Sequence, residues 1–426
     1  MPTVLCLGGT GQFGLPIARH LAADPIVDRV IVAGRDLAKA QAAAAMLGTK
    51  GVARQVDADD DASLAAAVEG ASVVVSTLWS AEGRAARVAR AAVAAGAHYV
   101  ELNDDTPDAD LAASARRAGV ALLRRVGASP GVTDLSERHV LEALDEPQVL
   151  LTMRHWTRLL DAWTDLFDAY VELPGGRRRG PLGRRLAATL TAAERDPATV
   201  AAVVRDACVA PFYLTLIGAP ERWSATVPDL RDGEVVDVDA LVEGFDVSPF
   251  VGAPRRERPL VATERPAQAD GIRRVATTVT GMGAAFDDAV RAGARRVAEG
   301  GALDAEAAAL EQAIERDPWA FLRPAAEVTT LPAVAYVAFG RRAGAPARAV
   351  ATLPDELFEP ERFLDLTAAA VAVTVRYLLD GTIVARGAAT MAVAVRDAER
   401  FGRDYLALMG PEFAGLDLYS RQVVPA

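Results

Sequence analysis

Residues 4–14 carry a glycine pattern suited to binding the phosphates of a dinucleotide. A short apolar run, 4–7, leads into Gly9-x-Gly11-x-x-Gly14, and a helical pattern of apolar residues follows. Gly9 would let the chain turn out of a strand, Gly11 would let the backbone approach a pyrophosphate, and Gly14 would let the helix pack close to the sheet. Free N–H groups at the helix start would bind the anion. A plain turn between buried elements is the alternative. The residues between the glycines are assigned to the same cofactor site: Thr10, Gln12 and Phe13.

Arg35 stands where the residue that reads the adenosine ribose belongs. A second apolar run, 30–32, ends about twenty residues after the glycines, the spacing expected of a dinucleotide fold. Ala33 and Gly34 occupy the place of a carboxylate that would bind the ribose 2′-hydroxyl, and Arg35 follows with a cation suited to a 2′-phosphate. The pattern favours NADP(H) over NAD(H). An ordinary solvated arginine at a helix start is the alternative.

Two further strand ends carry candidate ligand contacts. Asp57 follows the third apolar run, where its carboxylate could accept from the adenine amino group or cap the next helix. Trp79 follows the fourth run, where its indole could lie beside the cofactor and contact the substrate, or simply pack. The residues that end the fourth run are assigned to the cofactor site: Ser76, Thr77 and Leu78.

Glu101, Asn103 and His155 are the candidates for proton handling and substrate binding. Glu101 and Asn103 end the fifth run and could instead cap the helix that follows. His155, with Trp156 as a substrate-binding candidate, follows a later strand-like run, and a single histidine near a strand end is more often structural.

A turn at Ser129-Pro130-Gly131 is the last candidate part of a substrate site. Pro-Gly fixes a tight turn, and Thr133 or Asp134 can cap a helix predicted to run to about residue 144. The N-terminus of that helix would point toward the cleft.

These residues are positioned by alternating strands and helices over residues 1–125. Alanine-rich helical segments, most of them closed by a glycine, are expected near 15–23, 36–47, 62–69, 82–95 and 107–118. The strand-like runs lie at 4–7, 30–32, 52–56, 72–77, 99–102 and 120–123. The pattern predicts an α/β fold of the Rossmann type, a doubly wound parallel sheet that binds its ligand at the carboxyl ends of the strands.

Composition narrows the class of partner. With 426 residues the chain exceeds one usual core, so two domains are expected. A net charge of −11 argues against nucleic acid, and the interrupted basic stretch at 177–185 fits a solvated loop. Two cysteines cannot form a disulfide framework, and no leader or membrane span is apparent, so a cytoplasmic protein is expected.

Several chemistries are excluded by residue type and spacing. The four histidines, His20, His98, His139 and His155, are scattered and lack metal-ligand spacing, so no metal is expected. Lysine occurs only at Lys39 and Lys50, which rules out a Tyr-x-x-x-Lys pair and a Schiff-base lysine in the second domain.

The combined motifs resemble those of the saccharopine dehydrogenase-like oxidoreductases, which include saccharopine reductases, lysine 6-dehydrogenases and carboxynorspermidine synthases. The resemblance rests on Gly-Gly-Thr-Gly-Gln-Phe-Gly, Ala-Gly-Arg, Tyr-Val-Glu-Leu and Gly-Ala-Ser-Pro-Gly-Val-Thr-Asp, at 8–14, 33–35, 99–102 and 127–134, with a weaker likeness at 364–390. It implies a nucleotide domain at 1–135, an inserted α+β mixed-sheet substrate and dimerisation domain at 136–360, and a segment at 361–426 that returns to the nucleotide domain. Strand-like runs in the insertion lie at 149–155, 235–242, 272–279 and 334–339, and helical patterns near 194–207, 284–298 and 305–315.

The resemblance implies hydride transfer between NADP(H) and a carbon–nitrogen bond of an amino-acid-derived small molecule, by a homodimer. An iminium is already electrophilic, which suits a chain with no obvious acid–base dyad. Residues 152–158 and the aromatic stretch up to residue 170 depart from the glycine-rich pocket segment of saccharopine reductases, so the substrate stays open. Two alternatives remain. One is a reductase of carbon–carbon double bonds on an apolar substrate, and the other is a nucleotide sensor without catalysis.

Overall fold

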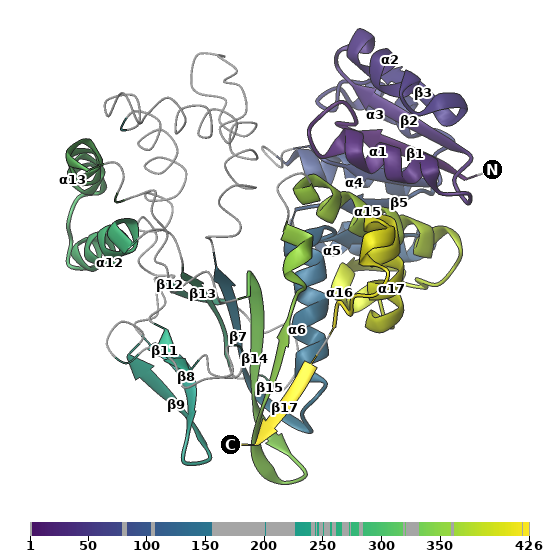
Figure 1. Ribbon diagram of the computed structural model, residues 1–426. Helices are drawn as coiled ribbons and strands as arrows, with labels where there is room; N and C mark the ends of the chain where they lie inside the picture. The colour runs from purple at the N-terminus through teal and green to yellow at the C-terminus, as the bar shows by residue number, and fades with distance from the viewer. Residues whose placement is uncertain are drawn as a thin grey trace. The chain divides into compact units, whose positions relative to one another are not determined.

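The computed structural model (Figure 1) divides into two compact units, residues 1–138 with 362–418 and residues 139–361 with 419–426. It describes residues 2–78, 83–103, 107–155, 201 and 226–425, with gaps in the last range at 240–242, 244, 247–249, 251–255, 258–260, 266–271, 273, 281–283, 318–319, 321–331, 359–361 and 420. Each unit has its own sheet and is described by itself.

The first unit is built on a seven-stranded sheet in which every pairing is parallel. The strand order is β16-β6-β5-β4-β1-β2-β3. The bounds are β1 Thr3–Leu7, β2 Arg29–Gly34, β3 Gly51–Gln55, β4 Val73–Ser76, β5 His98–Glu101, β6 Ala121–Arg124 and β16 Gly387–Thr390. The doubly wound parallel sheet is therefore confirmed, with a seventh strand added beside β6.

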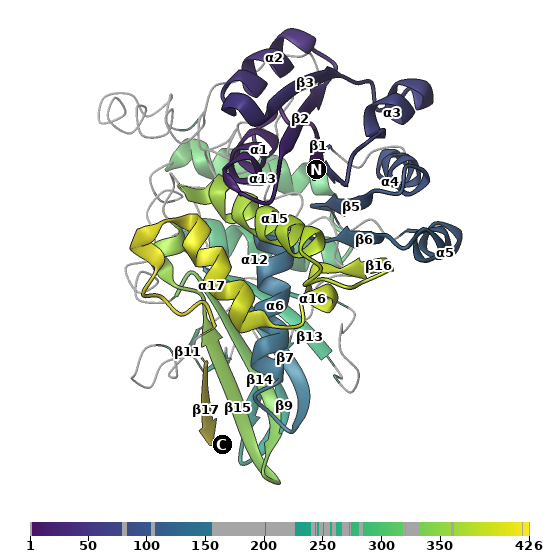
Figure 2. The ribbon, with the colours of Figure 1, turned by 90° about the vertical axis from the view of Figure 1, so that its right-hand side faces the viewer.

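Helices cover both faces of this sheet, which explains why its central strands are apolar without alternation. Leu5 and Leu7 of β1 share a core with Leu64, Val88 and Leu111, which belong to α3 (Asp61–Val68), α4 (Arg84–Ala94) and α5 (Ala109–Ala118). The opposite face carries α1 (Gly14–Ala23) and α2 (Leu37–Ala45). Figure 2 shows α3, α4 and α5 on one side of the strands and α1 and α15 on the other.

The chain returns to the first unit after β15, as the resemblance implied. Helix α15 (Phe363–Leu379) packs on α1, and α17 (Ala398–Met409) packs on α15. Two ion pairs fasten α15: His20 Nε2 lies 3.2 Å from Asp365 Oδ1, and Arg376 Nε lies 2.5 Å from Asp24 Oδ2. Strand β16 then pairs with β6.

The second unit contains a six-stranded mixed sheet in the order β12-β13-β7-β14-β15-β17. Only the β13–β7 pairing is parallel; the other four are antiparallel. The bounds are β7 Glu146–His155, β12 Val261–Arg265, β13 Arg274–Thr280, β14 Val334–Arg342, β15 Ala345–Thr352 and β17 Arg421–Pro425. The second unit also contains a hairpin of β8 (Thr226–Arg231) and β9 (Glu234–Asp239), a short antiparallel pair of β10 (Phe245–Asp246) and β11 (Arg256–Glu257), and the helices α12 (Ala284–Ala298) and α13 (Leu303–Arg316). An inserted mixed-sheet domain is confirmed.

Two expectations differ from the structure. Strand β17 pairs with β15, so residues 421–425 belong to the second unit, whereas we expected all of 361–426 to return to the first. Helix α6 (Thr133–Leu141) ends before residue 144. The helix expected near 194–207 lies outside the described residues except for Ala201. None of the described helices is long and apolar enough to cross a membrane.

Candidate cofactor site

The strand order reverses between β1 and β4, and the helices that follow these two strands begin differently from their neighbours. Chain order continues from β1 toward β3 on one side and from β4 toward β6 on the other. Helices α2, α3 and α5 each begin with an aspartate that accepts from their first-turn N–H groups, namely Asp36, Asp60 and Asp108. Helices α1 and α4 have no such side-chain cap. Uncapped helix starts at a topological switch point are where an open α/β sheet binds an anionic ligand.

Gly8 makes the turn that leads from β1 into the glycine loop. Its φ is +76°, the left-handed region that glycine enters without steric cost. The N–H groups of Gly8 and Gly9 both donate to Ala33 O, at 3.1 and 3.3 Å. The Thr77 hydroxyl donates to the Leu7 and Gly8 carbonyls, at 3.1 and 3.3 Å. Thr77 therefore holds the start of the glycine loop against the end of β4. We had not assigned a role to Gly8, although the Gly8-Gly9 pair in the sequence indicates a turn at this position.

The remaining glycines differ in what surrounds them. A Cβ on Gly14 would lie 2.1 Å from Gly8 O, and one on Gly9 would lie 2.9 Å from Cys6 O, so both positions need glycine for close packing. A Cβ on Gly11 would meet only Gly8 O, at 3.1 Å, and Gly11 is exposed. The space beside Gly11 is thus open on the side where a pyrophosphate would lie.

The start of α1 offers hydrogen-bond donors to a ligand. Leu15 donates to Gly11 O, and Ile17 donates to Phe13 O. Within the described part of the chain, the backbone N–H groups of Thr10, Gln12 and Gly14 have no protein acceptor. Three free N–H groups at the positive end of a helix dipole fit a pyrophosphate. The free N–H groups and the open space at Gly11 therefore fit the pyrophosphate of the dinucleotide that the glycine pattern implies.

Arg35 follows β2 with an exposed side chain. Among the described residues its guanidinium forms no ion pair, while its carbonyl accepts from Gln55 Nε2 at 3.0 Å. The adjacent Asp36 is occupied as the cap of α2, accepting from Lys39 N at 3.1 Å. Arg35 is thus free to meet a phosphate beside the end of β2.

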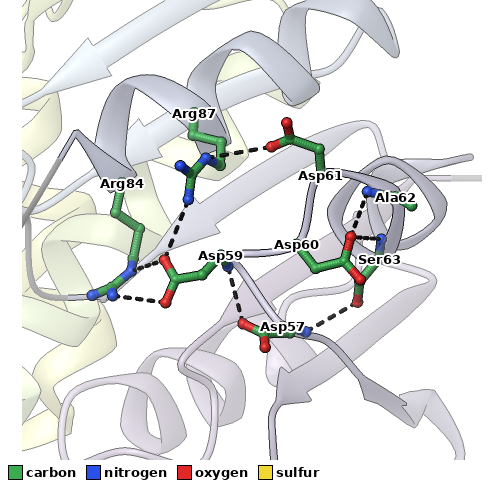
Figure 3. Close-up of polar contacts among 8 residues, drawn as sticks. All are labelled: Asp57, Asp59, Asp60, Asp61, Ala62, Ser63, Arg84 and Arg87. Carbon is green, nitrogen blue, oxygen red and sulfur yellow. Dashed lines mark hydrogen bonds and ion pairs between the residues drawn. The ribbon is translucent and has the colours of Figure 1, made fainter.

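Asp57 does not cap α3, the alternative role that its position allowed. The cap is Asp60, whose Oδ1 accepts from Ala62 N at 2.9 Å and Ser63 N at 3.4 Å. Asp57 instead holds the turn after β3: its Oδ1 accepts from Asp59 N at 3.0 Å, and its own N–H donates to Ser63 Oγ at 3.0 Å (Figure 3). Its carboxylate is exposed, which is compatible with the predicted contact to adenine.

The ends of β4, β5 and β6 are joined by Asn103. The side-chain Nδ2 of Asn103 donates to Leu78 O at 3.2 Å, and its main-chain carbonyl accepts from Arg125 N at 2.8 Å. Ser76 is buried at the end of β4, in register with Leu7 and Glu101. The predicted residues Ser76, Leu78 and Asn103 therefore lie at one edge of the sheet, next to the glycine loop.

Glu101 is buried on the side of the sheet that carries α4 and α5. Its Oε2 accepts from the Tyr99 hydroxyl at 3.1 Å, and only 3% of the residue is exposed. Both side chains line a small, mainly apolar pocket with Ala85, Ala89, Leu111, Leu122 and Arg124. The structure thus puts Glu101 at the predicted strand end, with its carboxylate turned to the face that carries α4 and α5.

The Ser129-Pro130-Gly131 segment is held at both ends. Arg125 Nε and Nη2 donate to Asp134 Oδ2 and Oδ1, at 2.7 and 2.9 Å. Asp134 is thus an ion-pair partner, not the helix cap we considered, while Thr133 Oγ1 donates to Ser129 Oγ at 3.4 Å. Gly131 has φ +128°, and a Cβ there would lie 2.9 Å from Arg125 O. The Ser129–Pro130 peptide bond is cis.

Three predicted site residues have side chains outside the described part of the structure. Trp79 and Trp156 lie outside the described residues, and of His155 only the backbone is described, ending β7 in the second unit. In the described part of the chain, no group of His, Cys, Asp and Glu side chains could hold a metal ion.

The chain is similar to known proteins in residues 4–128 and in its fold. Residues 4–128 match the family model of the saccharopine dehydrogenase NADP-binding domain. Apo histidine-tagged saccharopine dehydrogenase (L-Glu forming) from Saccharomyces cerevisiae shares the fold over 100% of both chains, with 15% identity and a TM-score of 0.58. A triphenylmethane reductase from Citrobacter sp., solved with NADP(H), covers 35% of this chain and 57% of its own, with 23% identity and a TM-score of 0.24.

Proposed function

We propose that the chain is an NADP-dependent oxidoreductase, because residues 4–128 match the family model of the saccharopine dehydrogenase NADP-binding domain. Its reaction would be hydride transfer to or from a carbon–nitrogen bond of an amino-acid-derived small molecule. The observation that carries the proposal is the glycine loop after β1. There, among the described residues, the N–H groups of Thr10, Gln12 and Gly14 have no protein acceptor, and the face at Gly11 is open.

The bound nicotinamide would supply the hydride chemistry, as it does in all such enzymes. The protein's part is to hold the dinucleotide and to exclude water from the reacting carbon. Thr10, Gln12 and Gly14 would hold the pyrophosphate through their backbone N–H groups, and the free Arg35 guanidinium would pair with a 2′-phosphate. A cation at this position supports a preference for NADP(H) over NAD(H).

The substrate would lie beyond the ends of β4, β5 and β6, where Asn103 joins three strand ends. We assign substrate contacts to Asn103 and to the Ser129-Pro130-Gly131 segment, with Trp79 and Trp156 as further candidates. Glu101 and His155 are the candidates for proton handling. Glu101 is supported for this role only by its place at the end of β5, where its carboxylate accepts from the Tyr99 hydroxyl.

The test is a scan of NADPH oxidation at 340 nm with the full-length protein, using cyclic imines, 2-oxo acids paired with amines, and enones as three separate substrate classes. Turnover of an imine or of an oxo acid with an amine, lost in Gly11→Val, would support the proposal. Turnover of enones alone would replace it with double-bond reduction. NADPH binding by calorimetry with no turnover in any class would favour a sensor.

Assembly is a separate part of the proposal. We expect a homodimer, and light scattering coupled to size-exclusion chromatography measures it directly. A mass near 45 kDa, that of one 44.7 kDa chain, would contradict a dimer.

A further inference from the structure

Three arginines, Arg35, Arg84 and Arg87, interact with Asp59 in the turn after β3, and Arg84 and Arg87 are already paired with carboxylates. Arg84 and Arg87 belong to the first turn of the uncapped helix α4. Arg84 Nε and Nη2 each lie 2.9 Å from an oxygen of Asp59, and Arg87 Nη1 lies 3.4 Å from the same carboxylate. Arg87 Nε also lies 3.3 Å from Asp61 Oδ1. Figure 3 shows both guanidiniums turned toward the turn after β3.

Asp59 is held in place by the backbone around it. Its N–H donates to Asp57 Oδ1, and the next residue, Asp60, caps α3. The carboxylate that pairs with the two arginines is therefore fixed by the same turn that contains Asp57. The pairing joins residues 25 and 28 positions apart, so it ties the turn after β3 to the start of α4.

Arg35 shares this electrostatic environment without an ion pair of its own. The Arg84 hydrogen bond lowers the pKa of Asp59, and the charges of Arg84, Arg87 and Arg35 lower it further. Four charged groups thus interact at this end of the sheet. Of the three cations, Arg35 is the one that forms no ion pair within the described residues.

We propose that Asp59 limits the affinity of the site for the 2′-phosphate of NADP(H), because its negative charge offsets part of the positive charge that Arg84, Arg87 and Arg35 bring to the end of β2. This inference rests on the proposed NADP preference and deepens it. With Asp59 ionised, the attraction between the 2′-phosphate and the three arginines is weakened by one nearby negative charge. Without that charge, the same cations attract the 2′-phosphate more strongly.

The experiment replaces Asp59 with asparagine, which keeps the shape and an acceptor for Arg84 but removes the charge. Calorimetry of NADPH and NADH binding to the full-length protein is the readout, at two salt concentrations. We expect Asp59→Asn to bind NADPH roughly threefold to tenfold more tightly, as fits one charge removed several ångströms away in a partly screened site. NADH affinity should change by less than about twofold, and the NADPH affinity should fall more steeply with salt.

Two further variants make the result specific. In Asp59→Asn/Arg84→Gln the gain should shrink or disappear, because the second substitution removes one positive charge and restores the net charge of the wild-type cluster. Asp108→Asn is the matched control: Asp108 pairs with Arg90, also on α4, and asparagine caps α5 as well as aspartate does. It should leave the NADPH to NADH ratio unchanged.

Every other outcome overturns the inference. Equal losses for both cofactors would mean that Asp59 only braces the loop, and weaker NADPH binding alone would mean that it orients Arg84 toward the phosphate. A wild-type preference for NADPH that Asp59→Asn leaves unaltered would remove this inference but not the proposed function. A wild-type protein with no preference would remove the proposed selectivity itself.

Discussion

The guanidinium of Arg125 and the carboxylate of Asp134 form a buried bidentate ion pair across the Ser129-Pro130-Gly131 segment. The Arg125 side chain is 13% exposed and that of Asp134 is 1% exposed. Arg125 itself has φ +57°, a conformation that a non-glycine residue rarely adopts. The pair thus stabilises a bent backbone at the point where the chain leaves β6 for α6.

Breaking this pair should destabilise the first unit. Asp134→Asn would remove the carboxylate charge that faces Arg125 Nε and Nη2, a change that costs about 3 kcal/mol or more in comparable buried pairs. Urea unfolding followed by circular dichroism measures it. The double variant Arg125→Met/Asp134→Leu should recover part of the loss, because neither charge is then buried unpaired. An Asp134→Asn protein as stable as the wild type would show that the pair contributes nothing.

The open face at Gly11 makes a sharp test of cofactor binding. Gly11→Val should keep the fold, since its Cβ would meet only Gly8 O, but the side chain would occupy the space assigned to the pyrophosphate. If two of the three proposed hydrogen bonds from the N–H groups of Thr10, Gln12 and Gly14 to the pyrophosphate are lost, NADPH affinity should fall roughly a hundredfold or more. Gly415→Val, where a Cβ meets nothing within 4 Å, is the control. Unchanged affinity in folded Gly11→Val would remove the phosphate assignment.

Replacing Arg35 tests the origin of cofactor preference. Arg35→Ala removes a guanidinium that has no ion-pair partner in the described chain, so its loss should disturb little of the protein itself. A charge-assisted contact of ~1.5–3 kcal/mol predicts a tenfold to hundredfold loss in NADPH affinity, with NADH almost unaffected. Calorimetry with both cofactors decides it, and equal losses would assign Arg35 to a part of the site common to both.

Mild acid should weaken the β5–β6 pairing through His98. Its Nδ1 accepts from Ala121 N at 2.9 Å, so the ring must be neutral there, and burial and then the charge of Arg386 lower the pKa of His98. The unfolded chain binds the proton more readily, near pH 6.5. The stability from this contact is therefore complete above pH 6.5 and is lost as the pH falls through the folded pKa.

The His98→Asn variant isolates this effect, because its amide oxygen can accept from Ala121 N–H without titrating. Melting temperatures between pH 7.5 and 5 should fall more for the wild type than for His98→Asn. Parallel curves for the two proteins would assign the acid sensitivity to other groups.

The Cys6 thiol should be inert in the native protein. It is fully buried in β1, and burial raises its pKa to about 12, so almost no thiolate forms at neutral pH. Iodoacetamide at pH 8 should leave the Cys6 peptide unmodified by mass spectrometry until denaturant is added. Labelling of native Cys6 would indicate that β1 opens in solution.

The sequence predicted the first sheet closely because its strands are buried on both faces. Such strands appear as short apolar runs bounded by turn residues, and the run at 4–7 became β1, Thr3–Leu7. Bounds were less accurate at the edge strand β3, where Val52 is 37% exposed and the apolar signal is diluted. The pairing of β17 with β15 was missed because 68 or more positions separate the two strands, and a local pattern does not specify a distant partner.

The candidate site was predictable where backbone conformation depends on residue type. The glycines at 8–14 predicted the loop. The length of one β-α-β unit predicted that Arg35 stands at the end of the second strand. The Asp59–Arg84 pairing could not be foreseen, because either residue reads as an ordinary solvated charge until the turn after β3 and the start of α4 are brought together. Asp57 and Asp60 were likewise interchangeable as caps at the level of sequence.

The packing of α15 on α1 has a consequence for how the chain is synthesised. The strands β1 to β6 are complete by residue 124, yet the helix that covers α1 spans Phe363–Leu379. During translation, the first unit must therefore wait for more than 230 further residues before its uncovered apolar face is sealed. Emerging chains expose that face to the crowded surroundings of the ribosome, where apolar surface invites aggregation. Asp24 and His20 receive their ion-pair partners, Arg376 and Asp365, only at the end of this stage.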